Sequence, residues 1–282
     1  MTTTIGLVAP GEMGAAVAAA VTAADARLVW ASHGRSDDTR RRAAVAGLED
    51  VGDLADLVTA SDVLLSICPP HAATEVAEEV AACGFRGCYL DANAVSPETA
   101  RTIDATVARG GAAFVDGGII GGPPRAAGTT RLYLAGADAD DVAALFDGGP
   151  LEAVVLSGGV PSASALKMAF AGWTKGSAAL LLAVRALAAA EGVEDDLLGE
   201  WSRSLPDLAE LSDRAAASGA RKGWRWIGEM DEIATSLEAA GLPGAFHEAA
   251  AEVYRRLAPL RDTPDEITAT RAVEALLHSQ EH

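Results

Sequence analysis

The residues with the clearest chemical meaning stand at the start of the chain, where an apolar run leads into a glycine turn. Gly11 and Gly14 follow the predicted strand Ile5–Ala9 in a variant of the G-x-G-x-x-G spacing, with Ala9 in the first position. Gly11 would let a pyrophosphate approach the backbone, Gly14 would let a helix pack closely on the strand, and the helix N-terminus would supply N–H groups. Such a turn can also be purely structural, but before a βαβ pattern it predicts a dinucleotide site. The expected cofactor-binding residues here are Ala9, Pro10, Gly11, Glu12, Met13 and Gly14.

The end of the second predicted strand indicates which dinucleotide is bound. A site that prefers NAD usually has an acidic residue there to bind the ribose 2′-hydroxyl, and this strand instead runs into Ser32, Arg35 and Ser36, with Arg40–Arg42 after them. Hydroxyls and guanidinium groups suit a 2′-phosphate. The sequence therefore favours NADP, with Ser32, Arg35 and Ser36 as ligands, although a solvated basic start to the next helix is the alternative.

Two further predicted strands end in residues that would reach the same edge of the sheet. The first ends at Cys68, Pro69 and Pro70 and the second at Asn93. Ligands of open α/β folds bind at the carboxyl ends of the strands. We therefore expect these four residues to contact the nicotinamide ribose, whereas Ser96 before Pro97 is predicted to cap a helix.

Hydride transfer leaves charge on an oxygen or nitrogen of the substrate, so the site needs a proton donor. Lys167, in a long apolar helix, is the first candidate for this general acid/base. Lys175 lies two turns further on and would bind an anion or a partner subunit. For each lysine the alternative is a side chain that reaches the surface or pairs with a carboxylate.

Aromatic residues and one histidine in the C-terminal half are candidates for the substrate pocket. Trp226 and His247 are the ones we expect to contact substrate, His247 as a proton relay. Aromatic residues on helices are more often part of the core. Arg125, in a Gly-rich loop, would either bind a substrate anion or be solvated.

Elements that position these residues follow from the hydrophobic pattern. Short β-rich runs alternate with helical stretches up to about Gly158, which is typical of parallel strands joined by crossover helices. We predict strands at Ile5–Ala9, Arg27–Ala31, Val63–Ile67, Cys88–Asp91 and Ala113–Asp116, and edge strands at Arg131–Leu134 and Ala153–Leu156 flanking a helix near Asp138–Phe146. The predicted fold is an α/β Rossmann domain over 1–160, followed by an all-α substrate and dimerisation domain over 161–282.

The C-terminal half is predicted to begin with a long interdomain helix. This helix starts at Pro161 and reaches about Glu191. Further helices are expected at Asp195–Arg203, Pro206–Ala217, Arg221–Ala240, Pro243–Arg256 and Pro264–Leu277. The long helix is nearly apolar all round and must be buried on most of its surface, so we expect a homodimer.

Composition excludes several classes of protein. The formal net charge of −18 and the pI near 4.6 argue against nucleic acid or an anionic membrane as the main partner. The three cysteines lack CxxC spacing and clustered histidines, so no disulfide framework or metal site is expected. No apolar run is long enough for a membrane span, and we expect a cytoplasmic protein that acts on a small molecule.

Together these motifs resemble the β-hydroxyacid dehydrogenase and 6-phosphogluconate dehydrogenase family over the whole chain. The resemblance rests on the Gly11–Gly14 turn, on Asp91–Pro97, on Phe114–Pro123 and on Lys167. It implies an NADP-dependent dehydrogenase or reductase for hydroxyl or carbonyl substrates. It also implies that Lys167 is the general acid/base and that the glycines at the end of Phe114–Pro123 help to bind substrate. The subgroup with a phosphogluconate-dehydrogenase-like C-terminal part is the most similar.

The sequence departs from this family at two polar positions. Ile120 stands where the family has a serine ahead of Gly121 and Gly122, and Ala171 stands where it has an asparagine one turn after Lys167. A small, carboxylate-anchored hydroxyacid is therefore a poor fit, although Ile120, Gly121, Gly122 and Ala171 would still line the substrate site. Two alternatives stay open: an NADPH-dependent imine reductase, which would not need these polar groups, and a non-catalytic NADP-binding protein.

Overall fold

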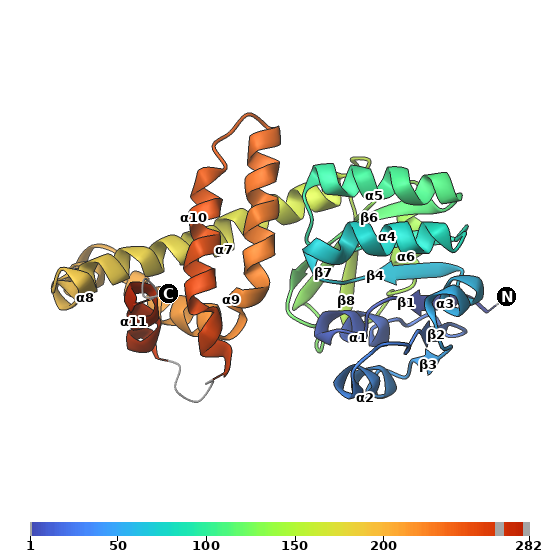
Figure 1. Cartoon of the computed structure of the whole chain (residues 1–282), viewed down its shortest axis with the longest axis horizontal. Coiled ribbons are helices and arrows are strands. Elements are labelled where there is room, and N and C mark those ends of the chain that lie inside the picture. The colour runs from blue at the N-terminus through green and yellow to red at the C-terminus, as the bar shows by residue number, and fades with distance from the viewer. Residues whose placement is uncertain (1, 263–267, 279–282) are drawn as a thin grey trace. The chain divides into compact units, whose positions relative to one another are not determined.

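In the computed structural model the chain folds into two compact units, Met1–Met168 and Ala169–His282. The structure describes residues 2–262 and 268–278. The first unit is an α/β domain and the second is built from helices (Figure 1). This confirms the predicted fold class, a Rossmann domain followed by an all-α part.

One eight-stranded sheet forms the centre of the first unit, in the order β3-β2-β1-β4-β5-β6-β7-β8. Its strands are β1 (Thr4–Leu7), β2 (Arg27–Trp30), β3 (Glu49–Asp50), β4 (Val63–Ser66), β5 (Cys88–Asp91), β6 (Ala113–Gly121), β7 (Thr130–Ala135) and β8 (Leu151–Val155). The β6–β7 pair is antiparallel and the other pairs are parallel. The carboxyl ends of β1, β2, β4, β5 and β6 therefore lie along one edge, where the predicted cofactor residues stand.

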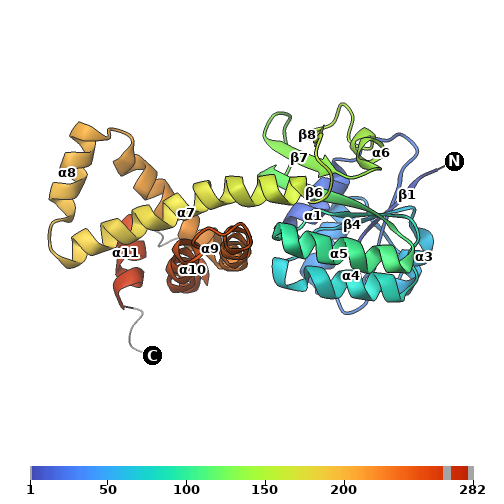
Figure 2. The ribbon, with the colours of Figure 1, turned by 90° about the horizontal axis from the view of Figure 1, so that it is seen from above.

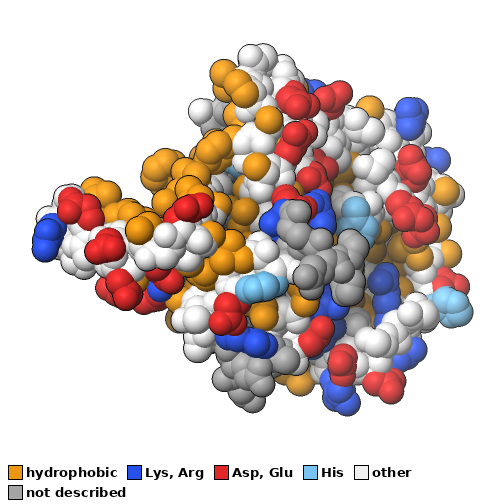
Figure 3. Space-filling model, turned by 60° about the vertical axis from the view of Figure 1, so that its left-hand side comes forward, with side chains coloured by type: hydrophobic (Ala, Val, Ile, Leu, Met, Phe, Trp, Pro, Cys, Tyr) orange, Lys and Arg blue, Asp and Glu red, His pale blue; other side chains and the backbone are white. Residues whose placement is uncertain are grey.

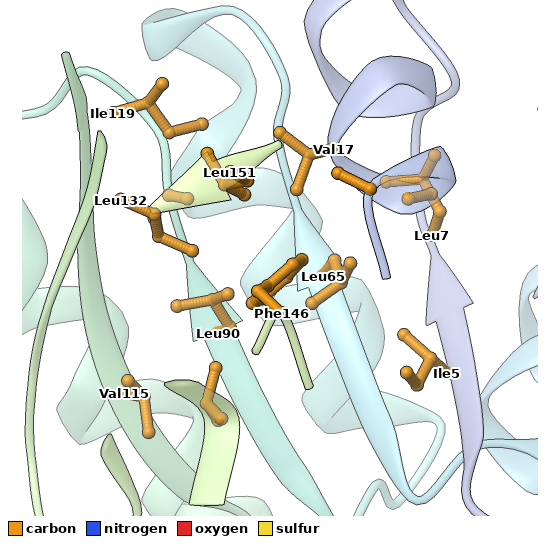
Figure 4. Packing of buried hydrophobic residues seen from close by; sticks show 14 of the residues in the cluster. Ile5, Leu7, Val17, Leu65, Leu90, Val115, Ile119, Leu132, Phe146 and Leu151 are labelled. Carbon is orange, nitrogen blue, oxygen red and sulfur yellow. The ribbon is translucent and has the colours of Figure 1, made fainter. Parts of the chain in front are cut away.

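Helices cover both faces of this sheet, because alternate residues of the buried strands point in opposite directions. Leu7, Leu65, Leu90 and Val115 belong to one apolar cluster, which Figure 4 shows from close by, and their neighbours in the strands belong to a second. The first cluster includes residues of α1 (Glu12–Ala19), α2 (Asp37–Val45) and α6 (Ala139–Ala144). The second includes residues of α3 (Leu54–Ala60), α4 (Ala73–Ala82) and α5 (Pro97–Gly110).

Local signals in the sequence set where several of these helices begin. Ser36 caps α2, Asp53 caps α3 and Ser96 caps α5, each by accepting a hydrogen bond from a backbone N–H of the first turn. Pro97 occupies the first position of α5, and Gly111 ends that helix in the left-handed conformation at φ 96°. The structure confirms the predicted capping role of Ser96.

In the second unit, helices pack on one another around small residues. Helix α7 (Ser162–Ala190) enters it from the first unit, and α8 (Glu194–Ser204), α9 (Leu208–Ala239), α10 (Ala245–Leu257), the 3₁₀ turn η2 (Ala258–Asp262) and α11 (Ala269–His278) follow (Figure 2). Arg185 of α7 is buried and donates to Glu194, to Ser212 and to Asp213. This one cation joins α7 to α8 and α9.

The structure corrects three expectations about the elements. Glu49–Asp50 forms strand β3, which is too short to show any alternation in the sequence. Strand β6 continues past Asp116 to Gly121, because β7 pairs with it along that stretch. The two helices expected at Pro206–Ala217 and Arg221–Ala240 are one helix, α9. Gly219 lies inside this helix and does not end it. A Cβ at this position would lie 3.0 Å from Leu257, so the glycine allows α9 to pack closely on α10.

Two remaining expectations concern the C-terminal helix and a membrane span. The predicted helix at Pro264–Leu277 corresponds to α11, but Pro264 lies outside the described residues. Among the helices that are described, none has the length and apolarity needed to cross a bilayer.

Candidate functional site

The glycine turn between β1 and α1 packs closely against the helix, as predicted for Gly14. The Gly11 N–H donates to the Ala9 carbonyl at 2.7 Å, and Gly11 is the residue before α1. A Cβ at Gly14 would lie 2.7 Å from the Ala9 carbonyl oxygen, closer than real contacts allow, so only glycine lets α1 approach this turn. A Cβ at Gly11 would meet nothing within 4 Å. The turn is thus tight on its inner side and open beside Gly11.

Arginine side chains surround this turn and the end of β2. Arg35 donates to the Val8 carbonyl at 3.3 Å, Arg42 donates to the Pro10 carbonyl at 3.1 Å, and Arg40 donates to the Ser32 carbonyl at 3.0 Å. Three guanidinium groups are thereby held against backbone carbonyls at the predicted cofactor site. Arg41 instead forms an exposed ion pair with Asp38.

Of the other two predicted 2′-phosphate ligands, Ser32 is buried at the end of β2 and Ser36 caps α2 through its side chain. Ser32 also hydrogen-bonds through its side chain to Asp50, an acidic residue that the sequence analysis missed. That bond, with the Gly52 N–H donated to Asp50 at 3.0 Å, lowers the pKa of the Asp50 carboxyl. The missed strand β3 carries Asp50 to this edge, so only the pairing of β2 with β3 reveals it.

A surface hollow lies beside these groups. Ser32 and Arg40 line one part of it, and Asp53 and Asp56 line another. It therefore combines a hydroxyl and one positive charge with two carboxylates, which would disfavour a phosphate on their side.

Asn93 links the carboxyl ends of β4 and β5. Its side-chain N–H groups donate to Ser66 at 3.0 Å and to Asp91 at 2.8 Å, and its side-chain oxygen accepts the Cys68 N–H at 2.6 Å. These bonds fix the backbone at Cys68, next to Pro69 and Pro70, where η1 (Pro70–Ala72) begins. Burial raises the pKa of the Cys68 thiol to about 11, which keeps it protonated at neutral pH.

Asp91 is a fully buried carboxyl behind this edge. Burial raises its pKa to about 7, while the hydrogen bonds from Asn93 act in the opposite direction and the charge of Asp116 adds to the rise. Asp91 and Asp116 are paired residues of neighbouring strands. No sequence signal predicts this pair, because each carboxylate by itself is an ordinary residue of a strand.

Lys167 lies against strand β6. A Cβ added at Gly118 would be 3.2 Å from the Lys167 Cβ, and the lysine itself is half-buried. Ile120 is buried on the same strand, whereas Gly121 and Gly122 are exposed at its end. Gly121 has φ 121°, and a Cβ there would lie 2.3 Å from the Thr129 carbonyl oxygen across the hairpin. The structure thus brings Lys167 next to Gly118, on the strand that leads into the predicted glycine motif.

The other predicted substrate residues belong to the helical unit. Lys175 forms an ion pair with Glu229, lies 5.4 Å from the centre of the Trp226 ring, and accepts a hydrogen bond at its carbonyl from Tyr254 at 2.6 Å. The His247 ring is 3.1 Å from the Gly172 carbonyl through Nε2, and its buried Nδ1 has no hydrogen-bond partner among the described residues. Ala171 is buried in α7. Lys175 and Trp226 are therefore neighbours, and the ammonium already has a carboxylate partner.

Comparison with known proteins identifies the family. The model described as the NAD binding domain of 6-phosphogluconate dehydrogenase matches residues 4–147, more than half of the chain. The chain belongs to this family. A second model, described as a domain of unknown function (DUF1932), matches residues 188–257. The resemblance expected from the sequence is confirmed.

Individual proteins are also similar to this chain. A curated relative is an uncharacterized 28.5 kDa protein of Methanothermus fervidus, 35% identical over 166 residues, which are 58% of this chain and 63% of the relative. The match thus spans less than two thirds of that protein. Among solved structures, the conserved protein MTH1747, described as similar to 3-hydroxyacid dehydrogenases, is 26% identical, with a TM-score of 0.68 over 93% of this chain and 99% of its own.

More distant structures share the fold alone. A Mycobacterium tuberculosis 3-hydroxyisobutyrate dehydrogenase, with L-serine, has a TM-score of 0.71 at 16% identity over 98% of this chain and 100% of its own. An imine reductase of Streptomyces aurantiacus has a TM-score of 0.54 at 16% identity over 97% and 99%. By name, these two neighbours are a dehydrogenase and a reductase.

The raised pKa of Asp91 predicts a pH dependence of stability. Because the folded chain holds this proton to a higher pH than the unfolded chain, the free energy of unfolding should fall as pH rises from about 4 to 7. Asp91→Asn should flatten this fall by about 2–4 kcal/mol. Urea unfolding from pH 5 to 8 measures it, with Asp140→Asn on the exposed face of α6 as the control. Equal pH slopes in wild type and Asp91→Asn would contradict the prediction.

Proposed function

We propose that this protein is an NADP-dependent oxidoreductase that transfers hydride between the nicotinamide and a hydroxyl or carbonyl substrate. The observation that carries the proposal is the glycine turn, open beside Gly11 and bordered by Arg35 and Arg42, with Arg40 at the neighbouring end of β2. The helix N-terminus of α1 would face the pyrophosphate there. Ala9, Pro10, Glu12 and Met13 complete the proposed pyrophosphate site, and Cys68–Pro70 with Asn93 would border the nicotinamide ribose.

The preference for NADP over NAD rests on charge. In a chain of net charge −18, two guanidinium groups at the glycine turn and a third at the end of β2 form a local positive site that suits a 2′-phosphate. Ser36 would add a hydroxyl donor, and Ser32, whose hydroxyl bonds to Asp50, would border the phosphate. Asp50 acts in the opposite direction, because the hydrogen bonds from Ser32 and the Gly52 N–H lower its pKa and keep its carboxyl ionised.

Proton transfer is the step that we assign to the protein's own residues. The cofactor, when bound, supplies or accepts the hydride at its nicotinamide ring. In the reducing direction the carbonyl oxygen then needs a proton, which the Lys167 ammonium would donate, and in the oxidising direction neutral Lys167 would take the hydroxyl proton. The proposed substrate-binding residues are Ile120, Gly121 and Gly122 at the end of β6, and Ala171, Lys175, Trp226 and His247 of the helical unit.

A second candidate function is NADPH-dependent imine reduction. Ile120 and Ala171 replace the two polar groups that would anchor a small hydroxyacid, and both are buried apolar residues here. An imine needs a proton on nitrogen and no carboxylate anchor, so this activity fits the same site. A protein that binds NADPH without turnover is the remaining alternative.

We also propose that α7 forms a homodimer contact with a second copy of this chain. Five large apolar side chains of α7 are exposed to solvent: Phe170, Trp173, Leu180, Val184 and Leu187. The exposed fraction is 76% for Trp173 and 62% for Leu187. Together with Ser177 they follow the alternating three- and four-residue spacing of a helix-pairing seam. The charged residues of α7, Lys167, Lys175 and Arg185, are all half-buried or buried, so the exposed positions carry no charge. An identical helix offers a matching uncharged surface of about 26 Å.

Gly11→Ala tests the cofactor site without disturbing the fold. A Cβ at position 11 meets no neighbour but would stand where the pyrophosphate approaches. We expect an unchanged melting temperature and a dissociation constant for NADPH raised by at least about tenfold. Fluorescence titration with NADPH and NADH measures this, with Gly199→Ala in α8, also free of neighbours, as the control. Equal NADPH affinity in both variants, or tighter binding of NADH by wild type, would contradict the proposal.

Lys167→Ala tests the proton donor. A positioned acid/base group typically contributes about 10² to 10⁴ in rate, so turnover should fall by about two orders of magnitude or more. The assay follows nicotinamide absorbance with a panel of alcohols, hydroxyacids, ketones and imines, and the exposed Lys222→Ala is the control. Unchanged turnover in Lys167→Ala would remove this lysine from the mechanism, and no turnover with any compound despite NADPH binding would favour the non-catalytic alternative.

The dimer seam predicts a change of mass in solution. Wild type should have about twice the 28.7 kDa of the chain, and the double variant Leu180→Glu with Leu187→Glu should be monomeric, because burying carboxylates in an apolar contact is unfavourable. Light scattering after size exclusion measures the mass. Val45→Glu, at a 91% exposed position of α2, is the control. A wild-type monomer, or a double variant with unchanged mass, contradicts this prediction.

A further inference from the structure

The first turns of α7 pack against one face of the C-terminal part of β6. In a strand, alternate residues point to the same side, so Asp116, Gly118 and Ile120 lie on one face of β6. In a helix, residues four apart share a face, so Ala163 and Lys167 lie together on α7. Figure 2 shows α7 beginning beside β6.

Asp116 forms the first contact between β6 and α7. One oxygen of its carboxylate accepts the N–H groups of Ala163 at 2.8 Å and of Ser164 at 3.0 Å, and the other accepts the Ser164 hydroxyl at 2.5 Å. Asp116 is completely buried and Ser164 nearly so. The carboxylate thus binds two N–H groups at the start of α7, where a negative charge is favoured.

Gly118 forms the second contact. A Cβ there would lie 2.6 Å from the Ala163 carbonyl oxygen and 3.2 Å from the Lys167 Cβ. Helix and strand backbones therefore meet without a side chain between them. Because α7 rests directly on β6, a shift of its first turn along the strand would carry Lys167 with it.

The position of this cap in the sequence distinguishes it from the caps of other helices. Ser36, Asp53 and Ser96 each precede the helix that they cap, so they fix where a helix begins. Asp116 is 47 residues from Ala163 and belongs to a strand. A cap from a strand fixes where the helix stands on the sheet.

We propose that Asp116 is a positioning residue, which holds the first turn of α7 on β6 and so sets the place of the Lys167 ammonium in the site. The proposal rests on the proposed role of Lys167 as proton donor. Burial raises the pKa of the Asp116 carboxyl, and the bonds from Ser164 and Ala163 act against that rise. The carboxylate and the helix start therefore depend on each other.

Ser164→Ala is the mildest test, because it removes one of the three hydrogen bonds and leaves the carboxylate in place. Thr106→Ala is the matched control: it removes another buried hydroxyl of the same unit, whose bond to the Thr102 carbonyl lies within α5. Ser164→Thr restores the hydroxyl and should recover the wild-type behaviour. Asp116→Asn, which replaces an acceptor by a donor facing N–H groups, should act more strongly.

Two measurements need no substrate. Hydrogen exchange of the amides of 163–168 should be at least about tenfold faster in Ser164→Ala than in Thr106→Ala. Acetylation of Lys167, read by peptide mass spectrometry on the NADPH-bound protein, should also be faster. Lys175 and Lys222, the other lysines of the chain, are internal references and should be unchanged.

Turnover then separates positioning from stability. With a substrate from the panel above, Ser164→Ala should lower kcat by about tenfold, with KM, NADPH affinity and melting temperature equal to those of Thr106→Ala, and Ser164→Thr should restore kcat. Matching kcat in Ser164→Ala and Thr106→Ala overturns the proposal, as do exchange and acetylation rates that stay at the wild-type level. If Lys167→Ala itself retains turnover, the proposed function fails first, and the exchange and acetylation rates still decide whether Asp116 holds this helix.

Discussion

Helix α1 packs so closely on the turn before it that position 14 must be glycine, because a Cβ there would clash with the Ala9 carbonyl oxygen. The same constraint recurs where α7 meets β6, at Gly118. In both places a glycine lets a helix N-terminus come directly onto backbone at the carboxyl edge of the sheet. Because the proposed cofactor turn lies at the first contact and Lys167 at the second, the spacing of both parts of the site depends on missing Cβ atoms rather than on side-chain complementarity.

Charge is distributed unevenly around this edge. The chain as a whole is strongly acidic, yet Arg35 and Arg42 donate to backbone carbonyls beside the glycine turn, and Arg40 donates to the Ser32 carbonyl at the end of β2. Backbone carbonyls fix a guanidinium group without neutralising it. A local positive site can therefore exist within a negative molecule, although Asp50, hydrogen-bonded to Ser32, and the nearby Asp53 and Asp56 oppose it.

Buried carboxylates form the opposite arrangement behind the edge. Asp91 and Asp116 are adjacent on β5 and β6, and burial raises both pKa values. Such groups lower stability unless hydrogen bonds compensate for lost solvation. Here the partners are Asn93 for Asp91 and the start of α7 for Asp116. Each carboxylate thus orders an element that borders the site, which gives a physical reason for its presence in the core.

The sequence by itself determined the α/β pattern, the glycine turn, the cap at Ser96 and the long apolar helix with Lys167, because alternation, helical period and turn chemistry are local properties. It did not reveal β3, the continuity of α9 through Gly219, or the convergence of Asp50, Arg42 and Asp116 on the site. Those features arise from pairing between segments far apart in the chain, such as β2 with β3 and β6 with α7. Only the tertiary structure decides them, because a two-residue strand, a glycine inside a helix and a carboxylate on a strand acquire their roles from the neighbours that folding brings to them.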